Sequence, residues 1–529
     1  MSATTGSARA IGGSITLGRG LMTLGGSVIA AVGGFSLAVL VGRSLGTAGA
    51  GVFFSIVAFV TILSTVLKLG TDTAQMWRIP RLLAEGRTER LWPTVRTAVI
   101  PTATVSAAAA LVVVVASEPL ASLLIDDSSR FQAREQLLWS ALVVACMAPM
   151  TVLIATTRAL GHIGPYVGIY NTGLPVVRLV VVATVLLAGA GGTATMAAWS
   201  VPMVVAVLLA AVLAHRQLSA VIAPRWRASP RSVRRRPDRE FWSFALPRGV
   251  TATLEVSLVA ANTLLVGVLM GPAAAGVFGA LSRFVTTGTM AERSVHILVS
   301  PRFSALLGQR DLEGATTLYQ RTTPWIVAVS WPIYLVLASA APTLLAVFGP
   351  GFDAGARALT VLALAMCLSQ LAGNAQTLLL MGGHSALQLL NKVAAIVVLI
   401  GLNLWLIPRF GLEGAAVAWS AAILTDTLLA VLQVRLVVGV RLVPAGLAPI
   451  AGMAVALFAL PTVVATRTLA AGLPGLLAAV LLGGLVYAAV LWRWRHRLEV
   501  DALVATRHGT PAHPTDTGSD RTDPGARRP

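Results

Sequence analysis

Charged and amide side chains recur at helical spacing inside segments of this chain that are otherwise apolar. Arg248, Glu255 and Asn262 are seven residues apart, so they share one face of a helix. An ionisable residue at the centre of a bilayer costs about 2.5–3.5 kcal/mol on insertion scales, so each one calls for a partner or a hydrated cavity. This face therefore predicts a polar surface inside a membrane protein.

The pattern occurs in other apolar segments. Arg283 shares its face with Thr287, and Lys68 shares its face with Thr61 and Thr65. Further polar positions within predicted spans are Arg178, Gln370, Asn374, Lys392 and Asp426. We expect these residues, together with the first three, to line one cavity, because polar faces on several helices hydrate a cavity better than they bind helices together.

The residue types suggest what such a cavity would do. Guanidinium and ammonium groups pair well with phosphate oxygens, so the cations suit an anionic substrate. A carboxylate such as Glu255 or Asp426 could instead carry a coupling proton or sodium ion, and no other cofactor is expected. In the alternative structural interpretation, Arg283 pairs with one of these carboxylates, and Lys68, Arg178 and Lys392 extend to the membrane interface.

The elements that position these residues are transmembrane helices. Hydrophobic residues make up 56% of the 529, charged residues only 12%, and apolar runs of about 20 residues, the length that crosses a bilayer, recur throughout. Helices follow because a lone strand cannot satisfy its backbone in lipid. The predicted fold class is an all-α polytopic membrane protein with about fourteen spans, centred near residues 31, 60, 106, 147, 177, 204, 257, 285, 335, 368, 399, 425, 455 and 482.

The chain is a duplication. Four uncommon residues recur in pairs separated by 225, 221, 222 and 220 positions, namely Gly46/Gly271, Cys146/Cys367, His162/His384 and Trp199/Trp419. The text LGTAGAGVF, ending at Phe53, matches MGPAAAGVF, ending at Phe278. A repeat of six spans predicts two pseudo-symmetric six-helix bundles of the same orientation, with spans thirteen and fourteen appended as a C-terminal pair.

Arginine placement predicts the orientation, because cytoplasmic loops retain positive charge. Arginines are dense between spans two and three, six and seven, and after span eight, so both termini are predicted to lie in the cytoplasm and the protein in the cytoplasmic membrane. The net charge of +19 follows mostly from this bias, and no nucleic-acid partner is expected. The predicted organisation is an N-terminal segment (1–20), a first bundle (21–214), a basic linker (215–240), a second bundle (241–438), the appended helices (439–494) and a disordered tail (495–529).

Motifs of enzymes are missing from the sequence. It contains no HExxH, P-loop or metal-spaced Cys/His cluster, and its longest predicted outward loop, about residues 117–136, is too short for a catalytic domain. We therefore expect no enzyme and no metal site. With no ATPase module either, the energy for transport would come from an ion gradient, the membrane potential or the substrate's own gradient.

Several phrases resemble a known family. They are GRSLGTAGAGVFFSIVAFVTIL from Gly42, LKLGTDTAQMWRIPRLLAEGR from Leu67, VFGPGFDAGARALTVLAL from Val347 and LIPRFGLEGAAVAWS from Leu406. Over roughly residues 15–440 the chain is similar to the polysaccharide transporter family of oligosaccharide-lipid flippases. This family belongs to the multidrug/oligosaccharidyl-lipid/polysaccharide (MOP) exporter superfamily.

The resemblance implies a V-shaped pair of bundles that alternates between inward- and outward-open states and moves an undecaprenyl-diphosphate-linked glycan across the cytoplasmic membrane. It also implies membrane lipids and glycan polymerases or glycosyltransferases as partners. Arg283 matches a position shortly after the GVF-like turn in span eight, where the family commonly carries a basic or an aromatic polar residue. Where many relatives have an Asp-Arg pair late in span seven, this chain has Asn262 and Thr263, so no charged site carries over there.

Three alternatives remain at this stage. Lipid II flippases of peptidoglycan synthesis share the fourteen-span plan. Ion-coupled drug and cation antiporters of the same superfamily usually have twelve spans. From a different class, the protein could be a membrane scaffold that recruits glycan-synthesis enzymes through its basic linker and tail.

Overall fold

The computed structural model describes residues 17–125, 129–222, 239–440, 447–465 and 472–493, and every element within these ranges is a helix. The predicted N-terminal segment, basic linker and C-terminal tail fall wholly or largely outside the described residues. Helices are the expected outcome, because each apolar segment satisfies its own backbone hydrogen bonds and can therefore lie in lipid.

The first half of the chain contains helices α1–α8 and two short helices of other types. In chain order they are α1 (Leu17–Leu67), α2 (Thr71–Ala84), η2 (Thr88–Arg90), α3 (Leu91–Val115), α4 (Ser117–Leu124), α5 (Arg130–Ala159), η4 (Tyr166–Gly173), α6 (Leu174–Leu187), α7 (Gly192–Ser200) and α8 (Pro202–Ile222). Of these, η2 is a 3₁₀-helix and η4 is a π-helix.

The second half repeats this plan and adds helices at its end. In chain order they are α9 (Arg239–Met270), α10 (Pro272–Gly308), α11 (Leu312–Ser339), α12 (Ala341–Leu345), η7 (Ala346–Phe348), η8 (Phe352–Gly355), α13 (Ala356–Gln370), α14 (Ala375–Met381), α15 (Ser385–Gln433), η9 (Val434–Val438), α16 (Leu447–Ala454), η10 (Val455–Ala459), α17 (Leu460–Val463) and α18 (Gly472–Arg493).

The all-helical membrane fold is confirmed. Ten helical segments in the described residues are long and apolar enough to cross a membrane, and the predicted centre of each of the fourteen spans falls within a helix. Two long helices each contain two spans, because a glycine with positive φ kinks them. These are Gly46 in α1 (φ 66°) and Gly411 in α15 (φ 56°), a backbone region that glycine enters at little cost.

The three-dimensional contacts repeat as the sequence does. Gly46 and Gly271 have nearly the same extended, positive-φ backbone, with φ/ψ of 66°/−175° and 86°/175°. The ring of Phe53 packs edge-on against Trp199 at 6.1 Å, and Phe278 lies 6.0 Å from Trp419. Since both members of each ring pair come from matched positions, the two halves fold as copies of one bundle.

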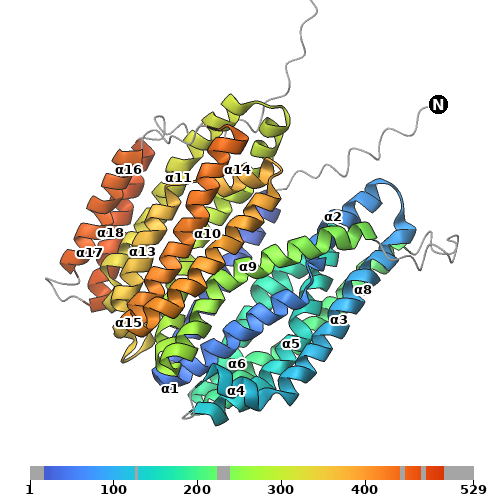
Figure 1. Ribbon diagram of the computed structural model, residues 1–529, viewed down its shortest axis with the longest axis horizontal. Helices are drawn as coiled ribbons and strands as arrows, with labels where there is room; N and C mark the ends of the chain where they lie inside the picture. Colours follow the sequence, from blue (N-terminus) through green and yellow to red (C-terminus); the bar gives the residue numbers. More distant parts are fainter. Residues whose placement is uncertain (1–16, 126–128, 223–238, 441–446, 466–471, 494–529) are drawn as a thin grey trace, which may run out of the picture.

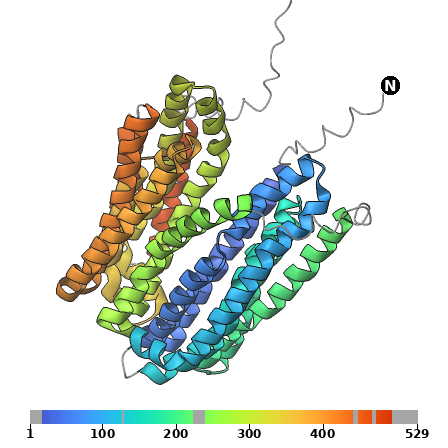
Figure 2. The same ribbon diagram turned by 45° about the vertical axis from the view of Figure 1, so that its right-hand side comes forward.

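Two arms make up the molecule. Figures 1 and 2 show α1–α8 in one arm and α10–α18 in the other, meeting near the kink of α1 and diverging towards the opposite end. At the meeting end the backbones touch, since a Cβ atom built on Gly51 would lie 1.6 Å from the carbonyl oxygen of Pro272. Arg43 also donates from its Nε to the carbonyl of Val347, at 2.8 Å. We call this the closed end.

Helix α9 crosses from one arm to the other. Near its start, Glu240 pairs with Arg78 of the first arm at 2.9 Å, and Phe244 stacks on Trp77 at 4.8 Å. Near its end, the side chain of α9 residue Asn262 accepts a hydrogen bond from Asn403 of α15. The helix therefore contacts both bundles, each with a different half of its length.

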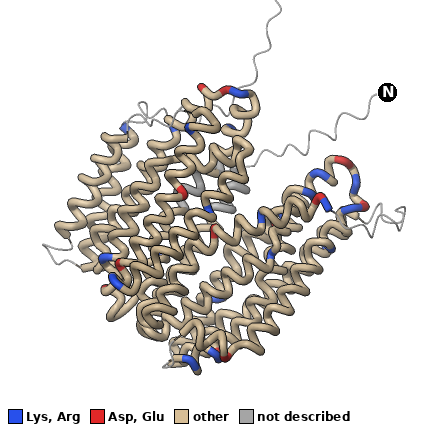
Figure 3. Tube along the Cα trace, viewed as in Figure 1, with Lys and Arg blue, Asp and Glu red and all other residues tan. Residues whose placement is uncertain are grey.

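Positive charge gathers at the diverging end of the first arm. Figure 3 shows Lys and Arg around the connection between α2 and α3, which contains Arg87 and Arg90. This is the connection that the sequence predicts to be cytoplasmic. We call this side of the molecule the arginine-rich end.

Candidate functional site

A pocket of about 350 Å³ lies within the first arm. Three elements build its wall: the bend between α1 and α2, the last part of α5, and the π-helix η4. The volume is in the range of about 300–1,000 Å³ that is typical of small-ligand sites. Its lining residues are Lys68, Asp72, Thr73, Met76, Thr151, Ile154, Ala155, Arg158, Tyr166 and Tyr170.

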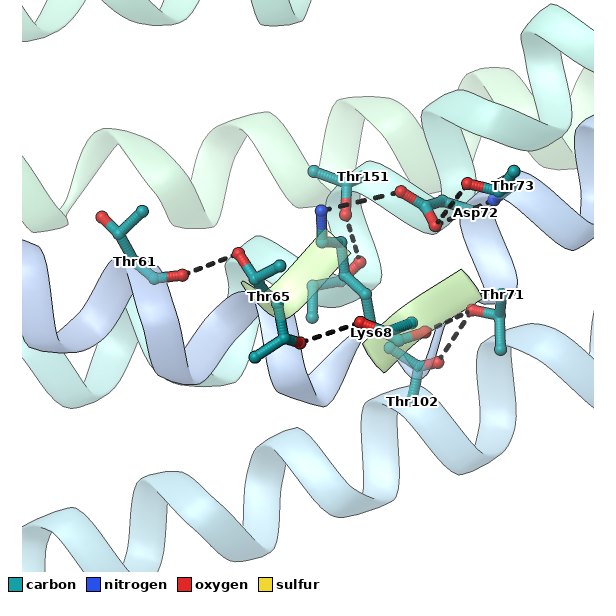
Figure 4. Close-up of polar contacts among 11 residues, drawn as sticks. Thr61, Thr65, Lys68, Thr71, Asp72, Thr73, Thr102 and Thr151 are labelled. Carbon is teal, nitrogen blue, oxygen red and sulfur yellow. Dashed lines mark hydrogen bonds and ion pairs between the residues drawn. The ribbon is translucent and has the colours of Figure 1, made fainter. Parts of the chain in front are cut away.

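Lys68 is placed in this pocket by a local ion pair. Its Nζ lies 3.6 Å from Oδ2 of Asp72, and Oδ1 of that carboxylate accepts from the backbone N–H of Thr73 at 2.8 Å (Figure 4). Both charged side chains are partly exposed, at 22% and 28%. The hydroxyls of Thr61 and Thr65 donate to backbone carbonyls of α1 itself, so these two threonines are satisfied by their own helix.

An arginine and two tyrosines form the opposite side of the pocket. The guanidinium of Arg158 lies 4.2 Å from the ring centroid of Tyr166, and Tyr166 stacks on Tyr170 at 5.7 Å with an interplanar angle of 16°. Arg158 has no carboxylate partner among the described residues. The stack therefore holds a cation in a fixed orientation without neutralising it.

Arg283 lies where the two arms meet. It belongs to α10, and its guanidinium is 5.6 Å from the ring of Phe54 on α1. Its Nε is buried and has no hydrogen-bond partner within the described part of the chain. A buried N–H donor without an acceptor is costly, so this position suits an anion that approaches between the arms.

Lys392 and Asp426 form a buried ion pair in the second arm. The Nζ of Lys392 is 2.6 Å from Oδ2 of Asp426, and the side chains are only 10% and 9% exposed. Gln376 donates to the same oxygen at 2.6 Å. The ammonium of Lys392 is therefore held within the second arm, between Asp426 of its own helix α15 and Gln376 of α14.

The amide residues are also held within the protein. Asn262 is buried and accepts from Asn403 at 2.9 Å, and Asn374 donates to the hydroxyl of Thr322 at 2.9 Å. Gln370 is buried at the end of α13. The contacts of Asn262 and Asn374 link them to other residues of the second half, so these two amides are satisfied within the protein.

Three further charges were predicted to line the cavity. Arg178 donates from Nε to the carbonyl of Trp199 at 2.9 Å and lies 4.0 Å from the same ring, so it binds α6 to α7 instead of extending to the interface. Arg248 is half-buried and Glu255 is exposed. Among the described residues Glu255 has no ion-pair partner, so Arg283 pairs with neither candidate carboxylate.

Of the predicted residues, the structure places Lys68 in the pocket of the first arm, pairs Lys392 with Asp426 in the second arm, and leaves Arg283 without an ion-pair partner among the described residues. The sequence prediction missed Arg158, Tyr166, Tyr170 and Gln376. The four-residue spacing of Tyr166 and Tyr170, which places both rings on one side of a helix, was an available signal. No group of three His, Cys, Asp or Glu side chains that could hold a metal ion occurs in the described ranges.

The fold of this chain is similar to those of known membrane transporters. A model of the MatE family matches residues 24–184. A multidrug resistance MATE family transporter of the MOP superfamily, in an inward-facing conformation, superposes with a TM-score of 0.61 at 15% identity, covering 78% of this chain and 95% of that one. The lipid II flippase MurJ, in an inward closed conformation, gives a TM-score of 0.67 at 11% identity, covering 90% and 99%.

A third similar structure is a variant of the MATE transporter VcmN from Vibrio cholerae, with a TM-score of 0.54, 16% identity and coverage of 78% and 95%. A search of curated proteins found no match. At these identities the likeness establishes the fold. The chain has the all-helical architecture that these transporters share.

Proposed function

We propose that this protein is a flippase that carries an undecaprenyl-diphosphate-linked oligosaccharide from the cytoplasmic to the outer leaflet of the cytoplasmic membrane. The observation that carries the proposal is Arg283, a cation between the two arms with a buried, unpartnered N–H. A guanidinium in such a place suits phosphate oxygens, because charge-assisted hydrogen bonds to phosphate are among the strong ones.

Alternating access explains why the molecule has two arms. Each unpaired sugar hydroxyl costs several kcal/mol in hydrocarbon, so the glycan must travel between the bundles while the lipid tail stays in the bilayer. The arms meet at the closed end and diverge at the arginine-rich end, which we assign to the cytoplasm (Figure 1). This arrangement is that of a state that would receive substrate from the cytoplasm.

The extent of the structural likeness also supports a lipid-linked substrate. The lipid II flippase covers 90% of this chain, whereas the MATE transporter covers 78%. The difference is consistent with the appended helices α16–α18, which a twelve-span drug transporter does not need. Glycan polymerases, glycosyltransferases and membrane lipids are the partners that this proposal implies.

Glu255 is the better of the two candidate carboxylates for a coupling ion. Asp426 already has an ammonium group 2.6 Å away, which neutralises it within the protein. Glu255 is exposed and has no ion pair among the described residues. We propose that a coupling proton or sodium ion, where one is used, binds at Glu255.

Ion-coupled efflux of drugs is a second candidate, because the matching family model over residues 24–184 is MatE. An exported organic cation would, however, be repelled by Arg283, which lies between the arms without a carboxylate partner among the described residues. Lipid II remains an alternative lipid-linked substrate, since it also carries a diphosphate. A scaffold without transport activity predicts that the charges inside the arms have no effect on glycan export.

The test is complementation of a strain depleted of this protein. We expect lipid-linked glycan to accumulate on the inner face and wild type to restore its exposure outside. Arg283→Ala should lower export at least tenfold at equal membrane levels, because a charge-assisted hydrogen bond contributes about 1.5–3 kcal/mol. Arg409→Ala, which removes an exposed arginine at the closed end, is the matched control and should restore export fully.

The outcomes separate the hypotheses. Full rescue by Arg283→Ala would remove this residue from the site while leaving transport intact. If depletion leaves the exposure of glycan at the outer face unchanged and increases sensitivity to cationic drugs, the result would favour drug efflux. Loss of export on deletion of the tail, with Arg283→Ala fully active, would favour the scaffold.

A further inference from the structure

The pocket in the first arm combines features that a diphosphate-linked sugar requires. Its lining contains two cations, Lys68 and Arg158, and one acid, Asp72, which leaves a net charge of +1. The Lys68 to Asp72 contact is long at 3.6 Å and partly exposed, so it orients the ammonium without removing its attraction for a stronger anion. The pocket therefore favours a group with several anionic oxygens.

The two cations face the pocket from different helices. Lys68 follows the end of α1, and Arg158 lies in the last turn of α5. A planar guanidinium can bind phosphate oxygens through two N–H groups, while an ammonium supplies a point charge. One phosphate on each cation is the arrangement that a diphosphate would use.

The tyrosine pair adds recognition of a ring. Tyr166 contacts both the guanidinium of Arg158 and the ring of Tyr170, and both tyrosines line the pocket. An aromatic ring with a hydroxyl offers an apolar face to the C–H face of a sugar and a polar edge to its hydroxyls. The segment that carries both rings, Tyr166–Gly173, is a π-helix, a rare form that is frequent at functional sites.

The pocket also lies at the depth of lipid headgroups. Lys68 is 22 residues beyond the kink at Gly46, and a helix rising about 1.5 Å per residue covers about 30 Å over that distance, the thickness of the hydrocarbon core. The kink marks the closed end, so Lys68 is near the membrane face at the arginine-rich end. A lipid diphosphate in that leaflet has its phosphates at this height.

We propose that the pocket formed by Lys68, Arg158, Tyr166 and Tyr170 captures the diphosphate and first sugar of a polyprenyl-linked glycan before it passes between the arms. The proposal rests on the proposed function and specifies where its substrate first binds. Lys68 and Arg158 hold the phosphates, Asp72 orients Lys68, and Tyr170 packs against the sugar.

Direct binding tests the assignment. Purified full-length protein in lipid nanodiscs is titrated with a polyprenyl-diphosphate monosaccharide and with the same polyprenyl diphosphate without sugar, each in competition with phosphatidylglycerol. We expect Arg158→Gln to weaken the affinity for both diphosphate lipids about tenfold or more. Tyr170→Leu should weaken only the affinity for the glycosylated lipid, by about threefold to tenfold. Arg158→Lys should retain part of the affinity, because the charge remains.

The control is Arg409→Gln, since Arg409 also lies over an aromatic ring, Trp405, at 4.8 Å, but outside the pocket. It should bind both lipids as wild type does. If Arg158→Gln does not fold, Tyr170→Leu still tests the proposal. Its expected effect is limited to the glycosylated lipid, whereas general instability would weaken the binding of both lipids. Equal binding by wild type and the pocket variants would overturn the proposal. Displacement of both diphosphate lipids by phosphatidylglycerol at equal concentration would also overturn it, because that result indicates a general site for anionic lipids.

The binding and depletion experiments distinguish an error in the pocket assignment from an error in the proposed function. If wild type binds the diphosphate lipids and the pocket variants bind equally well, only the pocket assignment is wrong. If wild type binds neither diphosphate lipid and depletion traps no glycan, the flippase proposal is wrong.

Discussion

Lys392→Met is expected to lower the free energy of unfolding by about 3–5 kcal/mol, because it leaves the carboxylate of Asp426 buried without its cation. Gln376 would still donate to this carboxylate at 2.6 Å, but a neutral amide does not compensate a buried charge. Equilibrium unfolding in mixed micelles measures the change.

A second substitution should restore much of this stability. In the double variant Lys392→Met/Asp426→Asn no net charge remains, and the new amide oxygen can still accept from Gln376. Replacing a buried ion pair by neutral groups is often close to neutral in stability. A large loss in the single variant and a small one in the double variant would show that the charge, and not the packing of the lysine, is responsible.

Arg357 and Glu413 provide the matched control. They form an ion pair at 3.4 Å in the same arm, but their side chains are 86% and 48% exposed. Arg357→Met should therefore change stability by about 0–1 kcal/mol. A Lys392→Met variant as stable as Arg357→Met would contradict the view that the buried pair stabilises the contact between the two segments of α15.

The sequence predicted the spans and the duplication well, for physical reasons. Apolar length sets which segments cross a membrane, and each segment is then obliged to be helical. Two of the paired positions were informative because their residues have matching structural roles in the two halves. Gly46 and Gly271 make the same positive-φ turn, and Phe53 with Trp199 repeats the contact of Phe278 with Trp419.

The partners of the charged residues could not be predicted in this way. Helical spacing shows which side of its own helix a residue occupies, but not which neighbour that side meets. Lys392 and Asp426 are 34 positions apart and lie on the two sides of the kink at Gly411, which folds α15 back on itself. Their pairing depends on that kink, which helical spacing within each span does not show.

The face shared by Arg248, Glu255 and Asn262 shows a second limit. All three lie on one side of α9, but this helix passes from the first arm to the second along its length. Asn262 is buried against Asn403 in the second bundle, whereas Glu255, two turns earlier, is exposed. One helical face therefore has different surroundings at each end, so equal spacing did not produce one continuous polar surface.

Gly51→Ala is expected to open the contact between the arms at the closed end. A Cβ atom at this position would lie 1.6 Å from the carbonyl oxygen of Pro272, and its counterpart on Gly276 would lie 2.1 Å from that of Thr47. Because both obstacles are backbone atoms, no change of side-chain rotamer can relieve them. The helices α1 and α10 must separate, at a cost of about 1–3 kcal/mol to the conformation in which they touch.

Such a cost should change which conformation the protein adopts. A difference of about 1–3 kcal/mol shifts a two-state population about 5- to 150-fold, here away from the state that is closed at this end. Spin labels on cysteines at the exposed positions Arg87 and Gln309, one on each arm at the arginine-rich end, report the change. With Cys146 and Cys367 replaced, we expect the distance between the labels to shorten in Gly51→Ala and in Gly276→Ala.

Gly401→Ala is the control, because it makes the same substitution within a transmembrane helix where a Cβ atom would have nothing within 4 Å. It should leave the label distance and glycan export unchanged. A shortened distance with export lost in both closed-end variants would mean that Gly51 and Gly276, matched residues of the repeated GVF sequence, form the contact that opens during transport. An unchanged distance in both would mean that the arms move about some other contact, and the glycines would then be required only for packing.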